Sequence, residues 1–262
     1  MAIRNKNVFT GVLGPVVLRD VNGKQVVAKR MIPGTMRQTE ATKLWSDTFG
    51  MASTLTAQFK RSFDFTAESY ADTTMTCRLT AAVSKILKDY RDKATRLYHF
   101  GENSFAGLTG FNFNINSPVE NLFIAQPQFN FEPGLLEIVF PQLSDTPIVQ
   151  FPKKSLRCRI SINVALFRLM DGWRSTLSDQ QEIIILNDKK ASQTAPLQFT
   201  IPDGCLCVVT LFLEYSGTGN NGWRILNDVK FNPCFILGTV ITPGIYKNSD
   251  NRLWTEMIRF AG

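Results

Sequence analysis

Apolar periodicity predicts a hairpin and two helices in the first hundred residues. Residues 16–19 and 25–28 are β-type runs on either side of Asn22-Gly23. Asn-Gly accepts positive φ at both central positions of a type I′ turn, so the pattern predicts a β-hairpin. Apolar residues then recur at spacings of three and four over about 39–59 and 71–96, which predicts two helices.

Beyond residue 100 the apolar period changes to two. Phe and Ile alternate with Asn over residues 111–116, and apolar residues alternate with Arg, Ser and Asn over residues 157–166. Further strands are predicted at residues 135–140, 182–186, 198–201, 206–215 and 234–242. Pro-Gly, Asp-Gly and Asn-Gly pairs lie between these strands and indicate turns.

These patterns predict an α+β protein. An N-terminal β-hairpin plus two helices, residues 1–103, precedes an antiparallel β-sandwich, residues 104–262, of immunoglobulin-like or jelly-roll-like type. The strands do not alternate with helices, which argues against a parallel sheet. No apolar run is long enough to span a bilayer, and Gly11, Gly14 and Pro15 interrupt the only candidate signal peptide. We therefore expect a cytoplasmic protein or part of an assembly exported by another route.

The composition is typical of a globular protein, and the charged residues are distributed unevenly along the chain. The chain is 44% hydrophobic and 19% charged, with a net charge of +7. Its first 100 residues hold 16 of the 29 Lys and Arg residues but only 8 of the 22 Asp and Glu residues. Five scattered cysteines suit a reducing compartment with free thiols.

The basic residues raise the possibility of a nucleic-acid site. Cations that could track phosphates are Lys29, Arg30, Lys153, Lys154, Arg157 and Arg159. The alternative interpretation is an exposed strand face or protected edge, because charges there oppose strand-to-strand aggregation. Aromatic residues are sparse around these cations, so we favour the second interpretation.

No residue pattern indicates catalysis, a metal or a cofactor. The run from Gly217 to Gly222 matches G-x-G-x-x-G, but a strand pattern follows it where a dinucleotide site needs a helix. His99 is the only histidine, and the cysteines lack C-x-x-C spacing. The acidic residues that could pair in a glycosidase are Glu132, Glu137, Asp179 and Glu182, and nothing in the sequence places two of them across a cleft. We predict a chain that is not an enzyme.

The opening segment resembles an uncharacterised bacterial family, a domain of unknown function. The resemblance covers about residues 8–60 and rests on Gly11-x-x-Gly14, the hairpin that contains Gly23-Lys24-x-Val26, the loop with Pro33, and the helix start at Thr39. Family members often have a further Gly-Lys-x-Gly run before the first strand, where this chain has Pro15 and Val16. The resemblance implies a bacterial or phage origin and no catalytic residues.

The sequence therefore favours a structural or adaptor protein that binds other protein subunits within a bacterial or phage assembly. Contacts would use strand edges, loops and aromatic anchors. The first contact candidate is the N-terminal hairpin, with Val16, Val17, Leu18, Val26, Val27 and Arg30. One alternative is a nucleic-acid-binding protein that uses the basic N-terminal half. A second is a carbohydrate-binding β-sandwich, in which Trp173, Trp223 and Trp254 would either supply binding platforms or seal the ends of the sandwich.

Overall fold

The computed structural model divides the chain into two compact units, Met1–Ser46 (unit 1) and Asp47–Gly262 (unit 2). The structure describes residues 2–5, 8–21, 23–31, 39–124, 126–141, 147–188, 195–219, 222–247 and 251–260. Helices and antiparallel sheets occur in separate stretches of the chain, which confirms the α+β class.

Unit 1 contains a four-stranded antiparallel sheet. Its strands are β1 (Ala2–Asn5), β2 (Val8–Leu13), β3 (Val16–Val21) and β4 (Lys24–Lys29), and each pairs with the next along the chain. Val21 pairs with Lys24, and Gly23 between them has a φ of 77°, which confirms the predicted hairpin. Asn22 lies outside the described residues. The two strands before the hairpin extend it into a meander that the sequence analysis did not predict.

Unit 2 is built from two antiparallel sheets. The large sheet contains β7 (Arg157–Arg168), β8 (Trp173–Ser175), β9 (Asp179–Leu186), β11 (Leu206–Gly219), β12 (Gly222–Ile225), β13 (Cys234–Ile241) and β14 (Trp254–Glu256). The small sheet contains β5 (Gln128–Glu132), β6 (Leu135–Val139) and β10 (Leu197–Thr200), in the order β10-β6-β5. Strands β7 and β11 pair along most of their length at the centre of the large sheet.

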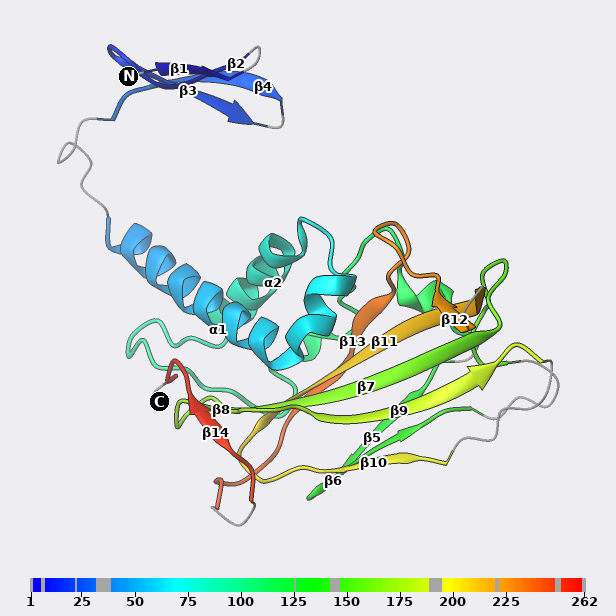
Figure 1. Ribbon diagram of the computed structural model, residues 1–262. Helices are drawn as coiled ribbons and strands as arrows, with labels where there is room; N and C mark the ends of the chain where they lie inside the picture. The colour runs from blue at the N-terminus through cyan, green and yellow to red at the C-terminus, as the bar shows by residue number, and fades with distance from the viewer. Residues whose placement is uncertain are drawn as a thin grey trace. The chain divides into compact units, whose positions relative to one another are not determined.

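Two helices cover one face of the large sheet (Figure 1). They are α1 (Glu40–Tyr70) and α2 (Met75–Asp89), and two short 3₁₀ helices follow, η1 (Ala106–Leu108) and η2 (Val119–Asn121). Leu55 and Phe59 of α1 are fully buried, and the Phe59 ring lies 4.8 Å from the Phe167 ring of β7 between centroids. None of the described helices combines the length and the apolar character needed to cross a bilayer.

The small sheet packs on the opposite face of the large sheet (Figure 1). Side chains alternate along β7, so Phe167 points to the helices while Val164 and Leu166 point to the small sheet. Gly238 on β13 permits this packing, because a Cβ there would lie 2.9 Å from the Phe129 ring. The middle of β7 and β11 is therefore buried on both sides, which explains their nearly continuous apolar sequences.

The sequence-based boundary between residues 103 and 104 falls inside unit 2. The period of the apolar residues changes near residue 100, but the chain divides into compact units after Ser46 instead. Phe105 and Leu108, just past the predicted boundary, share one core with α1, α2 and the large sheet. The helices belong with the sheets because their apolar stripes pack against the large sheet.

The predicted strand at residues 111–116 is wrong. The segment forms a loop with one isolated bridge, Asn112 to Phe235. The Asn112 side chain donates to the Gly110 carbonyl at 3.2 Å and accepts from the Val119 amide at 3.0 Å, and Asn114 accepts from the Asn116 amide at 3.0 Å. Asparagine side chains that bind nearby backbone groups compete with the strand ladder, so the alternating pattern marks a loop instead.

The second helix is shorter than predicted. It ends at Asp89 instead of continuing to Arg96. The Asp92 carboxylate accepts hydrogen bonds from the amides of Ala94 and Thr95 at 2.9 and 2.6 Å, and this local turn replaces the next helical turn.

Asp72 links the start of α2 to the loop that follows η1. Its carboxylate accepts from the Thr74 amide at 2.7 Å and from the Ile115 amide at 3.1 Å, and it pairs with Arg78 at 2.6 Å. Burial raises the pKa of Asp72, but these hydrogen bonds outweigh burial and lower the pKa from 3.8 to about 2. The ionised carboxylate therefore stabilises the folded state.

We expect Asp72→Asn to lower the free energy of unfolding by about 1 to 2 kcal/mol at neutral pH. The folded pKa lies below the unfolded value, so the carboxylate contributes fully above about pH 4, and its contribution is lost as the pH falls towards 2. Urea unfolding at several pH values measures the difference. Asp89→Asn, at the exposed last residue of α2, is the control and should change stability by less than about 0.5 kcal/mol. An equal loss for Asp72→Asn at pH 2 and pH 7 contradicts the assignment.

Candidate functional site

The strand register of unit 1 sorts its side chains onto two faces. We call them the Val16 face and the Val17 face. The register places on the Val16 face residues Ala2, Arg4, Phe9, Gly11, Leu13, Val16, Leu18, Asp20, Gln25, Val27 and Lys29. It places on the Val17 face residues Ile3, Asn5, Val8, Thr10, Val12, Val17, Arg19, Val21, Lys24, Val26 and Ala28. Both faces are rich in apolar residues, which is typical of a sheet covered on both sides.

No described side chain of unit 1 is buried. Leu13 and Val27 on the Val16 face are 59% and 61% exposed, and Ile3 on the Val17 face is 67% exposed. A sheet needs an apolar face packed against something to be stable in water, and unit 1 is only slightly longer than the roughly 40 residues below which oligomerisation or another support is usually needed. The sheet is therefore a candidate for covering by another protein.

The structure separates the predicted contact residues. Val16, Leu18 and Val27 share one face, whereas Val17 and Val26 lie on the other. Arg30 follows β4, and its amide donates to the Pro15 carbonyl at 2.7 Å. The hairpin therefore offers two surfaces instead of one.

A shallow aromatic hollow lies at one end of the large sheet. Its lining consists of Arg168, Trp173, Tyr246 and Trp254, and its volume is about 410 Å³. The Arg168 guanidinium carbon lies 3.9 Å from the centroid of the Tyr246 ring and 5.2 Å from that of Trp254. We call this feature the Trp173 hollow.

A larger cavity of about 560 Å³ opens beside the same end of β7 and β11. Tyr98, Phe100, Leu169, Leu206 and Ile241 contribute apolar side chains. Thr242, which also lines it, already donates to the Pro202 carbonyl and accepts from the Cys205 amide, each at 2.8 Å. His99 and Glu102, which are both exposed, also line this cavity. Among its described lining residues there is no further histidine and no second carboxylate.

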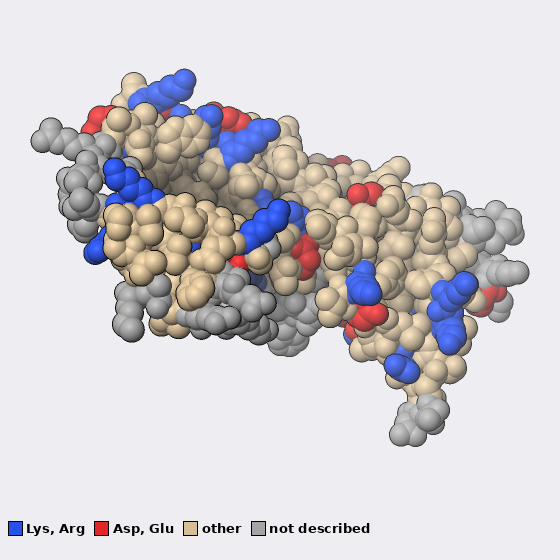
Figure 2. All heavy atoms as spheres, turned by 90° about the horizontal axis from the view of Figure 1, so that it is seen from above, with Lys and Arg blue, Asp and Glu red and all other residues tan. Residues whose placement is uncertain are grey.

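The cations of the predicted nucleic-acid site belong to separate local settings in the described structure. Arg159 lies between Glu214 at 2.8 Å and Glu182 at 3.5 Å. Arg157 stacks on Trp223 at 4.6 Å and donates to the Ser216 hydroxyl at 3.0 Å. Lys153 and Lys154 are exposed in the turn before β7, while Lys29 and Arg30 belong to unit 1. Figure 2 shows the Lys and Arg side chains of one face in separate groups instead of a continuous band.

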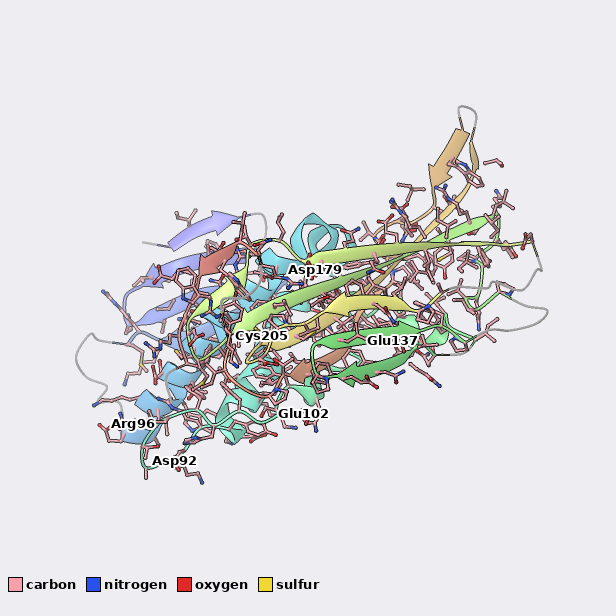
Figure 3. All side chains as sticks on the ribbon, turned by 90° about the horizontal axis from the view of Figure 1, so that it is seen from below. Asp92, Arg96, Glu102, Glu137, Asp179 and Cys205 are labelled. Atoms are coloured by element: carbon pink, nitrogen blue, oxygen red, sulfur yellow. The ribbon has the colours of Figure 1, made fainter. Side chains whose placement is uncertain are left out.

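Three of the acidic residues named from the sequence contact neighbouring side chains, and the fourth, Glu132, is exposed at the end of β5. Glu137 on the small sheet bonds Gln198 at 2.9 Å, and Asp179 on β9 pairs with Arg252. Figure 3 labels these two residues on different strands. Glu182 is held by Arg159 and by the Ser161 hydroxyl, which donates to it at 3.1 Å.

The cysteine side chains behave as small apolar groups. Cys158, Cys205, Cys207 and Cys234 are buried, and the five cysteines form no disulfide with one another. Burial raises the pKa of the thiols of Cys158, Cys207 and Cys234 well above the ordinary value, so these thiols stay protonated. Among the residues that the structure describes, no three metal-ligating side chains cluster.

The glycine-rich run forms a hairpin. Strand β11 ends at Gly219 and β12 begins at Gly222, so no helix N-terminus follows the glycines, as the sequence analysis argued. Gly217 has a packing role, because a Cβ there would overlap the backbone carbonyl oxygen of Lys154. Residues 220 and 221 lie outside the described residues.

Sequence reasoning missed several residues of these candidate sites. Phe9 and Leu13 lie on β2, whose apolar residues fall on both faces, so no alternation of apolar and polar residues marks this strand in the sequence. Arg168 and Tyr246 had no local signal either, because the register of β7, β8 and β14 and the path of residues 243–247 bring them together.

We expect Gly217→Ala to lower the free energy of unfolding by about 1 to 3 kcal/mol, because the added methyl group overlaps the Lys154 carbonyl. Gly50→Ala is the matched control. Gly50 lies within α1 with open space around its Cα, so the same change should stabilise the protein by up to about 1 kcal/mol. Chemical denaturation measures both.

The hairpin interpretation also predicts that NAD or ATP leaves the melting temperature of the protein unchanged. A clear increase in the melting temperature with either nucleotide contradicts this interpretation.

Comparisons with known proteins give no further identification. No family model matches the chain, and neither a curated protein nor a solved structure resembles it closely enough to count as a match. The resemblance of residues 8–60 to an uncharacterised bacterial family therefore stays a prediction.

Proposed function

We propose that this chain is a non-catalytic structural or adaptor protein that binds other protein subunits through its N-terminal sheet. The observation that carries the proposal is a paired four-stranded sheet with apolar residues on both faces and no buried described side chain. Covering such faces removes apolar surface from water, which stabilises both the sheet and the complex. A bacterial or phage setting rests on the sequence resemblance alone.

The charges on the two faces favour different partners. The register places Arg4, Asp20 and Lys29 on the Val16 face, so this face carries both signs of charge. Asp20 of one copy can therefore pair with Lys29 of another, and we propose a second copy of this chain as the first occupant of the Val16 face. The Val17 face carries Arg19 and Lys24, so it suits an apolar partner with acidic residues at its rim.

The edge of the sheet is less suited to self-association. Among the described strands, β4 pairs only with β3 and leaves its other edge open. An antiparallel pair of two β4 strands in central register places Lys24 opposite Lys29, and like charges directly opposite each other are destabilising. We therefore expect contacts through the faces instead of pairing between two β4 strands.

The finer classification of unit 2 also belongs to this proposal. We infer an antiparallel sandwich of immunoglobulin-like or jelly-roll-like type, which is supported by the core that the two sheets share. Such a unit has its own core, so we expect it to fold without residues 1–30.

The nucleic-acid alternative has weaker support. Two of its six predicted cations, Arg157 and Arg159, already contact side chains of the large sheet. A protein that neutralises phosphates shows affinity that falls steeply with salt. We therefore expect no salt-sensitive binding of DNA or RNA.

Deletion of residues 1–30 tests the proposal. We expect the full chain to self-associate and the truncated chain to be monomeric with its thermal transition retained, because the apolar faces are removed while the core of unit 2 stays complete. Light scattering after size-exclusion chromatography, across a range of concentrations, measures the mass. A truncated chain that associates like the full chain contradicts the proposal, as does a full chain that is monomeric up to about 1 mM.

Single substitutions identify the face. Val27→Glu places a charge on the Val16 face and should weaken self-association at least tenfold, while Val26→Glu changes the Val17 face and should leave it nearly unchanged. Ser53→Glu on the exposed side of α1 controls for the added charge. Equal effects of Val27→Glu and Ser53→Glu contradict the role of the Val16 face.

A further inference from the structure

The register of three strands builds the Trp173 hollow. Arg168 on β7 pairs directly with Trp173 on β8, and Trp173 pairs with Glu256 on β14, two residues from Trp254. The three side chains of Arg168, Trp173 and Trp254 therefore share one face of the sheet. Leu166, two residues earlier on that face of β7, belongs to the core under the small sheet, so the hollow begins where that core ends.

The aromatic residues of the hollow are fixed before any ligand binds. The indole nitrogen of Trp254 donates to the Tyr246 hydroxyl at 3.0 Å, and the two rings meet edge to face at 5.1 Å between centroids. Gly204 has a φ of 70°, and a Cβ there would lie 2.6 Å from the Tyr246 nitrogen. The close approach of these two segments requires glycine at position 204 and places the Tyr246 ring against Arg168.

Tight turn geometry also brings a donor and an acceptor beside the rings. The β7–β8 turn closes with the Gly172 amide donating to the Arg168 carbonyl at 2.8 Å, and Gly172 has a φ of 80°. Asp171 in this turn accepts from Nε and Nη2 of Arg168 at 3.0 and 2.7 Å. The Asp171 side chain is 41% exposed, and Nη1 of Arg168 donates to no described residue.

We propose that the Trp173 hollow binds a neutral carbohydrate. A sugar ring has an apolar C–H face that can stack on the accessible Trp173 indole, and hydroxyl groups around its edge that both donate and accept. Asp171 supplies the acceptor and Arg168 Nη1 the donor. The volume of about 410 Å³ lies within the range of about 300 to 1,000 Å³ typical of small-molecule sites.

The charge and the occupied donors argue against other ligands. Asp171 neutralises Arg168 at 2.7 Å, so the site offers no net positive charge to a phosphate or a sugar acid. A proline-rich peptide docks between aromatic rings, and Trp254 has already donated its N–H to Tyr246.

Titration of the full chain with neutral oligosaccharides of glucose, xylose, mannose and N-acetylglucosamine tests the proposal, with tryptophan fluorescence and calorimetry as readouts. We expect at least one to bind with a dissociation constant below about 1 mM. Trp173→Ala should weaken that binding at least tenfold, because the stacking surface is lost. Trp223→Ala is the matched control, since Trp223 is exposed on β12 and lies outside the hollow.

Asp171→Asn keeps a side chain of the same size but removes the charged acceptor, so it should weaken binding severalfold without disturbing the fold. An unchanged thermal transition checks that each variant is folded. The proposal is overturned if none of these neutral saccharides binds, if Trp173→Ala and Trp223→Ala affect binding equally, or if only an acidic saccharide or a proline-rich peptide binds. Self-association measured in parallel keeps this result separate from the role of the N-terminal sheet.

Discussion

The structure depends on one constraint, which is that an apolar face of a sheet must be covered. In unit 2 the constraint is met twice at the same strands. Helices α1 and α2 cover one face of β7 and β11, and the small sheet covers the other face. In unit 1 the described side chains of both faces are left uncovered. This difference, more than any single residue, makes the N-terminal sheet the element from which we infer function.

Much of this architecture can be predicted from the sequence where the local pattern and the tertiary environment agree. The Asn-Gly hairpin and the two helices follow from turn chemistry and from a period of 3.6, and both are present. The failures occur where side chains bind the backbone. Asn112 and Asn114 hold a loop whose apolar–polar alternation resembles that of a strand, and Asp92 forms a turn within residues 71–96, where the sequence predicted helix.

The candidate sites were less predictable, because they depend on register and on chain path. The sequence analysis named Val16, Val17, Val26 and Val27 as contacts, but only the pairing of β3 with β4 shows which of them share a face. Trp173 and Trp254 were visible as possible platforms. Arg168 lies beside Trp173 because their strands pair. Tyr246 lies near them because its segment approaches Gly204 closely, and no local sequence pattern indicates that approach.

Amide hydrogen exchange of the full chain, at concentrations on both sides of self-association, tests the central claim most directly. The account predicts that residues 8–31 exchange rapidly in the monomer and become protected in the associated form, while β7 and β11 are protected in both. Equally strong protection of residues 8–31 in the dilute monomer would contradict it, because the sheet would then be stable without a second protein.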